Sequence, residues 1–342
     1  MISIKFSLRL ALTAASVLVA GAAARAETIS VYCGAEEEQC QVMAVGFKKA
    51  TGIDVAMIRK SSGEILAQIR AEARNPRADI WWAGTGDPHL QAAEEGLTEV
   101  YRSPMLDKLH PWARTQADQS GFRTVGIYAN ALGFLYNTEL VDKKKLAPPA
   151  CWADLIKPEF KDEVQMANPN SSGAAYTALA TLVQLLGEEP AFDYLRKLNA
   201  NINQYTKSGG APASAASRGE TTVGMSFLAL GVIHVLNKFP VKVVAPCEGT
   251  GYEIGSMSLI KGAPNPKAAK AFYDWALTAP AQELSIEAKS YQAPSNRDAK
   301  MPPEAPNLDN VKLIDYDFRK FGSTQERKRL LTRWDAEIGS KR

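Results

Sequence analysis

Short segments rich in β-branched and aromatic residues recur near the start of the chain, and each leads through a polar loop into a helical pattern. These segments are 27–32, 53–59 and 78–82, and the helical patterns after the first two cover 40–51 and 65–74. This β-loop-α repetition predicts an α/β domain with a largely parallel sheet. In such sheets, ligands bind at the loops beyond the carboxyl ends of the strands.

A second α/β unit follows the long extended segment 124–137. It contains a predicted strand at 163–167, a helix at 174–186 and a strand at 223–228, and a second long extended segment covers 241–260. At roughly 100–200 residues per domain, a chain of this length has room for two domains. We therefore expect two Rossmann-like lobes with mainly parallel sheets, joined by two long hinge strands. A small ligand is expected in the cleft between the lobes, with hinge closure around it.

The loops that follow the predicted strands carry glycine, hydroxyl and acidic residues. Free N–H groups at helix N-termini favour anions, so these loops suit a phosphate, phosphonate or carboxylate. Glutamates beside them can accept a hydrogen bond from a hydroxyl or ammonium group elsewhere on the ligand. Lys207 either pairs with the anion or points into solvent, Trp81 is expected in the core, and the place of Trp82 is left open. The candidate ligand-binding residues are Gly34, Glu36, Ser61, Ser62, Gly63, Gly84, Thr85, Ser171, Ser172, Gly173, Ser208 and Glu248.

Residues 1–26 have the pattern of a cleavable secretory signal peptide. Lys5 and Arg9 precede an apolar run over 10–24, and cleavage is expected after Ala26. Removing this segment takes away Lys5, Arg9 and Arg25, so the basic residues fall from 40 to 37 and equal the 37 acidic residues. A formally neutral mature chain argues against nucleic acid as a partner.

Four cysteines lie beyond the predicted leader, where disulfides persist after export. Four cysteines allow three pairings, and we favour Cys33–Cys40 as a short loop clamp, with Cys151–Cys247 as the second bond. The alternative is a zinc site, but no C-x-x-C motif occurs and the three histidines lack ligand spacing. We expect no bound metal or other cofactor.

A secreted α/β hydrolase is the alternative from a different functional class. Its nucleophile would be Ser62 or Ser172, paired with one of the three histidines. The chain contains neither a G-x-S-x-G elbow nor an H-E-x-x-H motif. We therefore expect a binding protein rather than an enzyme.

Several segments, in this order and spacing, resemble the type 2 periplasmic solute-binding proteins of ABC importers. The resemblance covers about residues 27–300 and is strongest with the ferric-binding and hexose-phosphate-binding branch. It implies the type 2 binding-protein fold, a periplasmic monomer, a membrane permease as partner, and lobes formed by 27–123 plus 248–300 and by 124–247 plus 301–342. The segments are VYCGAEEE (31–38), SSGEILAQI (61–69), ADIWWAGTGDPHLQAAEEGL (78–97), GIYANALGFLYN (126–137), CWADLIKPEFKD (151–162), ANPNSSGAAYT (167–177) and SMSLIKGAPNPKAAKAFYDW (256–275).

The chain departs from this branch at the positions that hold its ligands. Iron binders use a histidine, an acid and paired tyrosines where this chain has Glu36, Gly84-Thr85 and Phe227-Leu228. Hexose-phosphate binders share the PCEGTGYE segment (246–253), but they place a His-Asp pair where this chain reads Phe-Leu-Ala-Leu at 227–230. The expected ligand is therefore a small anion such as a phosphorylated sugar, phosphonate or organic acid. Ferric binding by unusual ligands is the alternative.

Overall fold

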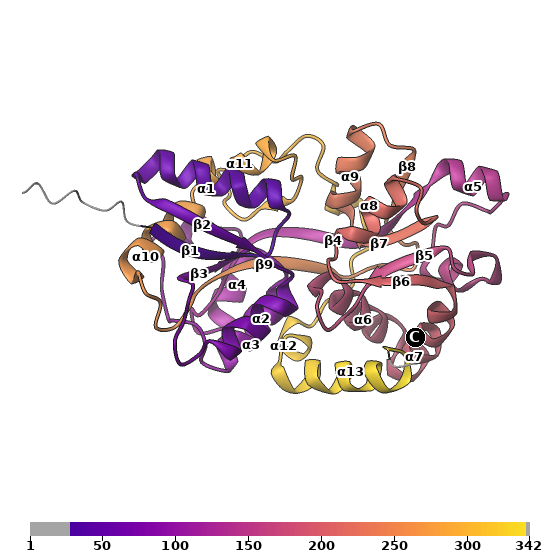
Figure 1. Ribbon diagram of the computed structural model, residues 1–342, viewed down its shortest axis with the longest axis horizontal. Coiled ribbons are helices and arrows are strands. Elements are labelled where there is room, and N and C mark those ends of the chain that lie inside the picture. The colour runs from indigo at the N-terminus through magenta and orange to yellow at the C-terminus, as the bar shows by residue number, and fades with distance from the viewer. Residues whose placement is uncertain (1–27, 340–342) are drawn as a thin grey trace, which may run out of the picture.

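A computed structural model describes residues 28–339, and the predicted leader, 1–26, lies outside the described residues. Two α/β halves lie side by side, and strands β4 (Val125–Asn137) and β9 (Tyr252–Leu259) run between them (Figure 1). We call the half built on β1, β2 and β3 the N-lobe and the half built on β5, β6 and β7 the C-lobe. The predicted two-lobed α/β architecture is confirmed.

The sheet is mixed, with the strand order β2-β1-β3-β9-β4-β7-β5-β6, and β8 and β10 also pair with β4. Three parallel strands form each lobe's sheet, as predicted, whereas β9 and β4 pair antiparallel with each other and with their outer neighbours β3 and β7. The antiparallel pair therefore connects the two parallel sheets. The other strands are β1 (Thr28–Cys33), β2 (Asp54–Arg59), β3 (Ile80–Trp82), β5 (Val164–Ala167), β6 (Ile202–Thr206), β7 (Val223–Phe227), β8 (Val241–Val244) and β10 (Ala293–Pro294).

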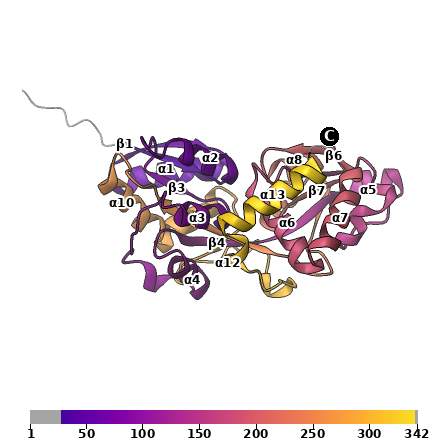
Figure 2. The same ribbon diagram turned by 90° about the horizontal axis from the view of Figure 1, so that it is seen from below.

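Helices lie on both faces of each parallel sheet (Figure 1). The C-terminal helix lies at the bottom of the C-lobe in Figure 1 and in front of it in Figure 2, which is seen from below. The helices are α1 (Glu37–Thr51), α2 (Ser62–Ala71), α3 (Gly86–Glu94), α4 (Pro111–Gln119), α5 (Thr138–Lys144), α6 (Gly173–Leu186), α7 (Glu188–Asn201), α8 (Ala211–Ser217), α9 (Leu228–Leu236), α10 (Pro266–Ala276), α11 (Ala279–Glu287), α12 (Phe318–Phe321) and α13 (Thr324–Glu337). Short 3-10 helices cover η1 (Leu106–Lys108), η2 (Trp152–Ile156), η3 (Pro158–Phe160) and η4 (Leu308–Asn310).

The second predicted hinge segment, 241–260, is not one continuous strand. It divides into β8 and β9, and the chain between them turns through Pro246 and Gly249, whose φ is 110°. Proline cannot donate to a strand ladder, and glycine is the residue that adopts this φ without strain. The turn places Cys247 beside Cys151, so β8 pairs with the C-lobe part of β4 while β9 pairs with its N-lobe part.

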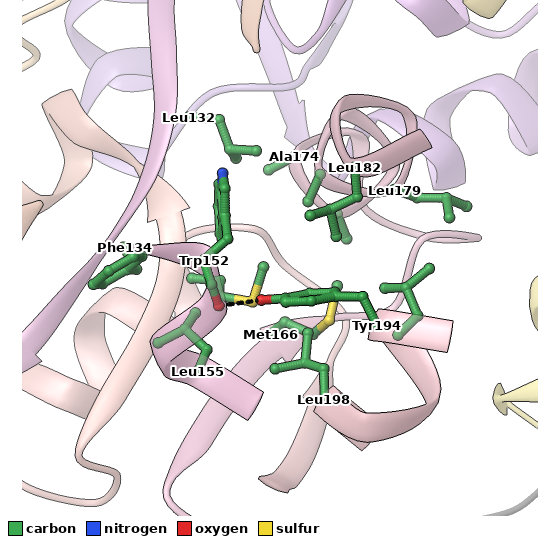
Figure 3. Packing of buried hydrophobic residues seen from close by; sticks show 14 of the residues in the cluster. Leu132, Phe134, Trp152, Leu155, Met166, Ala174, Leu179, Leu182, Tyr194 and Leu198 are labelled. Atoms are coloured by element: carbon green, nitrogen blue, oxygen red, sulfur yellow. Dashed lines mark hydrogen bonds between the residues drawn. The ribbon is translucent and has the colours of Figure 1, made fainter. Parts of the chain in front are cut away.

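Each lobe has its own large hydrophobic cluster, and β4 contributes to both. Tyr128 belongs to the N-lobe cluster, which includes Phe47 and Phe272, whereas Phe134 packs with Trp152 in the C-lobe cluster. In the C-lobe, the buried Tyr194 hydroxyl donates to the Trp152 carbonyl at 2.7 Å (Figure 3). The division into 27–123 plus 248–300 and 124–247 plus 301–342 stays a prediction.

Both predicted disulfides, Cys33–Cys40 and Cys151–Cys247, are present. The first ties the end of β1 to α1, and the second ties the start of η2 to the turn before β9. Among residues 28–339, no helix is both long and apolar enough to cross a membrane.

Candidate ligand-binding site

A cavity lies between the lobes, at the ends of the parallel strands of both sheets. Its floor is formed by Tyr128 and Asn130 of β4 and by Glu253 of β9. The N-lobe contributes Gly34, Ala35, Glu36, Gln39, Arg59, Ser61, Ser62, Gly84, Thr85 and Gln292, and the C-lobe contributes Ser172, Gly173, Ala174, Ser208, Gly209, Gly210, Phe227 and Leu230.

Helix N-termini converge on this cavity from both lobes. The residues that precede α1, α2, α3, α6 and α9 all line it, and these are Glu36, Ser61, Thr85, Ser172 and Phe227. Because the first N–H groups of a helix have no partner within the helix and carry partial positive charge, each N-terminus favours an anion. The convergence follows from topology, since every parallel strand ends at this edge and is followed by a helix.

Arg59 is a cationic side chain in the cavity wall. Its Nε donates to the Ala35 carbonyl at 3.1 Å, and its Nη2 lies 3.0 Å from Ser208 Oγ and 3.4 Å from Glu36 Oε2. Since Ser208 belongs to the C-lobe, Arg59 connects the two lobes at the edge of the cavity. The guanidinium adds a full positive charge to the partial charges of the helix N-termini.

The two lobes contact each other around the cavity. Ser61 Oγ donates to the Lys207 carbonyl at 3.2 Å, and Gly63 N donates to the Ser171 carbonyl at 3.0 Å. Within the C-lobe, Ser171 Oγ donates to the same Lys207 carbonyl at 3.0 Å. At Gly173, an added Cβ would lie 1.9 Å from Thr85 Oγ1, so the first turn of α6 packs tightly on the start of α3. The structure is therefore the closed arrangement of the lobes.

One hydroxyl in the cavity wall lacks a partner within the described residues. Thr85 Oγ1 is buried and makes no hydrogen bond there, whereas the Asn130 amide faces the Glu253 carboxyl beside it. Neighbouring groups are satisfied, because Thr85 N donates to Ser62 Oγ and Gly84 N donates to Tyr128 Oη, both at 3.1 Å. Buried polar groups almost always have a partner, so the Thr85 hydroxyl is a candidate contact to a ligand.

The two acids of the cavity both have raised pKa values. Burial raises the pKa of Glu253 well above its usual range, and the neighbouring Asp87 raises it further. Burial also raises the pKa of Glu36, and the nearby Arg59 opposes that shift. Desolvation penalises the charged form of an acid, so the buried Glu253 carboxyl favours a proton or a cationic partner, whereas the Glu36 side chain is 40% exposed and has Arg59 as a partner.

The structure brings most of the predicted site residues together. Gly34, Glu36, Ser61, Ser62, Gly84, Thr85, Ser172, Gly173 and Ser208 line the cavity. Gly63 and Ser171 lie just outside it and form the contacts between the lobes. Lys207 is exposed and takes part through its backbone carbonyl rather than its ammonium group.

Glu248 does not belong to this site, contrary to the sequence-based expectation. Its carboxylate accepts from the backbone N–H groups of Trp152 and Ala153, at 2.8 Å each, and so caps the start of η2. The Cys151–Cys247 disulfide holds Glu248 at this position. Glu248 was predicted to accept a hydrogen bond from a hydroxyl or ammonium group of the ligand, and the backbone N–H groups of η2 take that place.

Arg59, Asn130 and Glu253 were not predicted from the sequence. Arg59 is the last residue of β2, two positions before Ser61 of the loop that was singled out. Asn130 and Glu253 lie within the buried hinge strands and pair with each other across β4 and β9. Both strands contain other buried polar residues, so the pattern alone does not single out these two.

The two tryptophans do not line the cavity. Trp81 is fully buried and stacks on His89, with ring centroids 3.6 Å apart, so its predicted core position is confirmed. Trp82 is also buried and packs in the N-lobe cluster. Neither ring is placed to stack on a ligand in the cavity.

The fold and the cavity between its lobes define a solute-binding protein, and residues 75–320 match the family of bacterial extracellular solute-binding proteins. The chain belongs to this family, and the resemblance to the type 2 solute-binding proteins of ABC importers is confirmed. A protein of Haemophilus influenzae that carries no assigned function is 43% identical over 337 residues, which is 98% of this chain and 97% of that protein.

Two solved structures are similar over nearly their whole length. The periplasmic binding protein AfuA of Actinobacillus pleuropneumoniae, solved with exogenous fructose-6-phosphate bound, is 45% identical with a TM-score of 0.90, covering 92% of this chain and 99% of AfuA. The periplasmic binding protein P5PA is 41% identical with a TM-score of 0.88, covering 91% of this chain and 99% of P5PA.

Proposed function

We propose that this protein captures a small anionic solute in the cleft between its lobes and delivers it to the membrane permease of an ABC importer. The solute is a phosphorylated sugar, a phosphonate or an organic acid. The observation that carries this proposal is the convergence of the α1, α2, α3, α6 and α9 N-termini on one cavity. We also propose that the chain is exported to the periplasm, acts there as a monomer and has no catalytic activity of its own.

The electrostatics of the cavity favour a bound anion. A charge at a helix N-terminus is stabilised by about 0.3–1 kcal/mol at an exposed site and by up to about 2 kcal/mol when it is partly buried. In the cavity, the N-termini of two lobes act on the same volume, and Arg59 lies beside it. The hydroxyl groups of Ser62 and Thr85 supply neutral donors to the same ligand, whereas the Ser61 hydroxyl donates to the Lys207 carbonyl.

Binding and closure are coupled, because the ligand contacts both lobes. An anion that accepts from the starts of α2 and α6 at once stabilises the arrangement in which Ser61 contacts the Lys207 carbonyl and Gly63 contacts the Ser171 carbonyl. A ligand shifts a conformational equilibrium by as much as its affinity differs between the two states. The closed arrangement is therefore expected to dominate only when the ligand is bound.

The alternatives receive less support from the lining of the cavity. Tyr128 is the only tyrosine that lines the cavity among the described residues, so the paired tyrosines expected of ferric-binding relatives are not assembled here. None of the three histidines lines this cavity, so neither Ser62 nor Ser172 has a histidine base beside it in residues 28–339. The fructose-6-phosphate bound in AfuA supports a phosphorylated ligand here.

A thermal-shift screen tests the proposal. The panel contains inorganic phosphate, hexose phosphates, alkyl phosphonates and dicarboxylates, with the corresponding neutral sugars as controls. A ligand at one hundred times its Kd stabilises the folded state by about 2.7 kcal/mol. Stabilisation by one class of anion and by no neutral sugar is the expected result, whereas a panel without any stabilising anion would refute the proposal.

A substitution of Arg59 separates site binding from general charge effects. Arg59→Met removes the guanidinium at the cavity, and Arg74→Met removes an exposed one elsewhere in the N-lobe. Both variants change the net charge equally. We expect Arg59→Met alone to weaken binding of the stabilising anion, and equal affinities for the two variants would remove Arg59 from the site.

A further inference from the structure

The side chains that line the cavity carry more negative than positive charge. Glu36 and Glu253 are the acids of the lining, and Arg59 is its only base within the described part of the chain. The partial charges of the helix N-termini compensate one anion. A ligand that is only an anion would nevertheless enter a site that already holds a surplus carboxyl group.

Glu253 is the acid without a compensating charge. Only 4% of its surface is exposed, and it forms no ion pair with any basic side chain of residues 28–339. The acid Asp87 lies close enough to raise the pKa of Glu253 further, while the buried Arg327 acts on Asp87. Burying an unpaired carboxylate is costly, so this carboxyl needs a proton or a cation from outside the protein.

Glu36 is the second acid of the same cavity, which it lines together with Tyr128 and Glu253. Glu36 has one long contact with Arg59, at 3.4 Å, and its Oε1 closely approaches Gly210 of the C-lobe. Arg59 already donates to Ala35 and Ser208, and therefore neutralises Glu36 only in part.

Asn130 lies beside Glu253 in the floor of the cavity. It pairs with Glu253 across β4 and β9, and only 2% of its surface is exposed. Its Oδ1 accepts from Ala229 N at 3.3 Å, and its amide hydrogen-bonds the Glu253 carboxyl, which opposes the rise in the pKa of that acid. The floor thus offers a carboxyl group and an amide side by side.

We propose that the ligand is a zwitterion, whose oxyanion binds the convergent helix N-termini and whose protonated nitrogen binds Glu253 and Glu36. This inference rests on the proposed function, because it assigns the second half of the same ligand. The N–H groups of the protonated nitrogen donate to the two carboxylates, and the added positive charge balances the surplus acid. The substrate class is an amine or other protonated nitrogen compound that carries a phosphate, phosphonate or carboxylate.

Matched probe pairs test the proposal. Glucosamine 6-phosphate and glucose 6-phosphate differ by an amine in place of a hydroxyl, and O-phosphoethanolamine and ethyl phosphate differ by the presence of an amine. Calorimetric titration of the full-length mature protein measures the affinity for each. We expect the amine of at least one pair to bind about tenfold or more tightly than its partner, which corresponds to about 1.4 kcal/mol.

Carboxyl-to-amide variants locate the effect. Glu253→Gln and Glu36→Gln remove the acids of the site, and Glu139→Gln on the exposed face of α5 makes the same charge change far from it. Removing one partner of a buried charged pair costs about 30-fold or more in affinity, so we expect Glu253→Gln to lower the affinity for the amine member of each pair by that factor. The affinity for the member without the amine should change much less. Circular dichroism checks that each variant folds.

The outcomes separate this inference from the proposed function. Tight binding of both members of a pair, with no selective loss in Glu253→Gln or Glu36→Gln, refutes the zwitterion and leaves anion capture intact. That result would indicate a protonated Glu253 that donates to a ligand oxygen. Failure of all four phosphate esters and of every other anion in the screen refutes both proposals.

Discussion

Replacing Gly173 with alanine introduces a single methyl group at the interface between the lobes. Gly173 is the first residue of α6, and the added Cβ would lie 1.9 Å from Thr85 Oγ1 and 2.8 Å from the Cβ and Cγ2 of Thr85. Real Cβ contacts are not this short, so the lobes must separate or Thr85 must move. The substitution therefore acts on closure rather than on the interior of either lobe.

The expected magnitude follows from these distances. Overpacking a well-packed contact costs about 1–3 kcal/mol, and this cost applies only in the closed arrangement. Ligand affinity should therefore fall by about 5- to 150-fold. Within α6, alanine is favoured over glycine by up to about 1 kcal/mol, so the ligand-free variant should be no less stable than wild type.

The assay combines three measurements on the wild type and the variant. Calorimetry gives the affinity for the anion found in the thermal-shift screen, urea unfolding gives the stability without ligand, and small-angle scattering gives the radius of gyration with saturating ligand. We expect lower affinity, unchanged or higher stability, and a larger radius for Gly173→Ala. Thr85→Ala removes Oγ1 and Cγ2, two of the atoms that the new methyl group would meet. In a double-mutant cycle, the affinity lost in Gly173→Ala should therefore be smaller in the Thr85→Ala background, and the difference is the coupling energy.

Wild-type affinity in Gly173→Ala would contradict this reasoning, because it would mean that the ligand-bound protein does not require the contact between Gly173 and Thr85. A loss of affinity with equal loss of ligand-free stability would also contradict it. In that case the methyl group would be disturbing the C-lobe itself.

Three further predictions concern the site and the stability of the fold. Ser172→Asp should keep the start of α6 capped, because aspartate is a good N-cap residue, while like-charge repulsion weakens anion binding; unchanged affinity in titration would remove this residue from the site. Burial lowers the pKa of His89 to about 3, so the unfolded chain takes up a proton below pH 6.5 that the folded protein refuses. The contribution of His89 to the free energy of unfolding is therefore fully present above pH 6.5 and falls by up to about 5 kcal/mol toward pH 3. Urea unfolding of His89→Gln should lack this part of the pH dependence. The same dependence of stability on pH in both proteins would refute a buried, neutral His89. Replacing both cysteines of the Cys151–Cys247 bond, whose sequence separation is 96, should cost about 4–5 kcal/mol, against about 2–3 kcal/mol for the Cys33–Cys40 bond, whose separation is 7; the reverse order in denaturant unfolding would show that loop entropy does not govern their contributions.

The loops that follow the parallel strands could be predicted from the sequence as a binding region. Ser61, Thr85 and Ser172 each follow a short apolar segment and precede a helical pattern, and strand-loop-helix topology brings such positions to one edge. Both disulfides also followed from the positions of the cysteines. These features depend on local pattern and on the general rules of α/β folds.

The remaining features depend on tertiary arrangement. Glu248 was predicted to contact the ligand, but its true partners, the N–H groups of η2, lie about a hundred residues earlier. Asn130 and Glu253 become neighbours only through the antiparallel pairing of β4 with β9. The contact between Gly173 and Thr85 forms only when the lobes meet, and no local pattern encodes it.

The ligand carried by the native protein tests the central claim most directly. The protein is purified from its own cellular compartment without denaturation, the bound molecule is released and identified by mass spectrometry, and the stripped protein is titrated with the identified compound. We expect one molecule per chain that carries a phosphate, phosphonate or carboxylate group and rebinds to the stripped protein. A neutral compound or a metal ion that rebinds in its place, with no anion recovered, would contradict it.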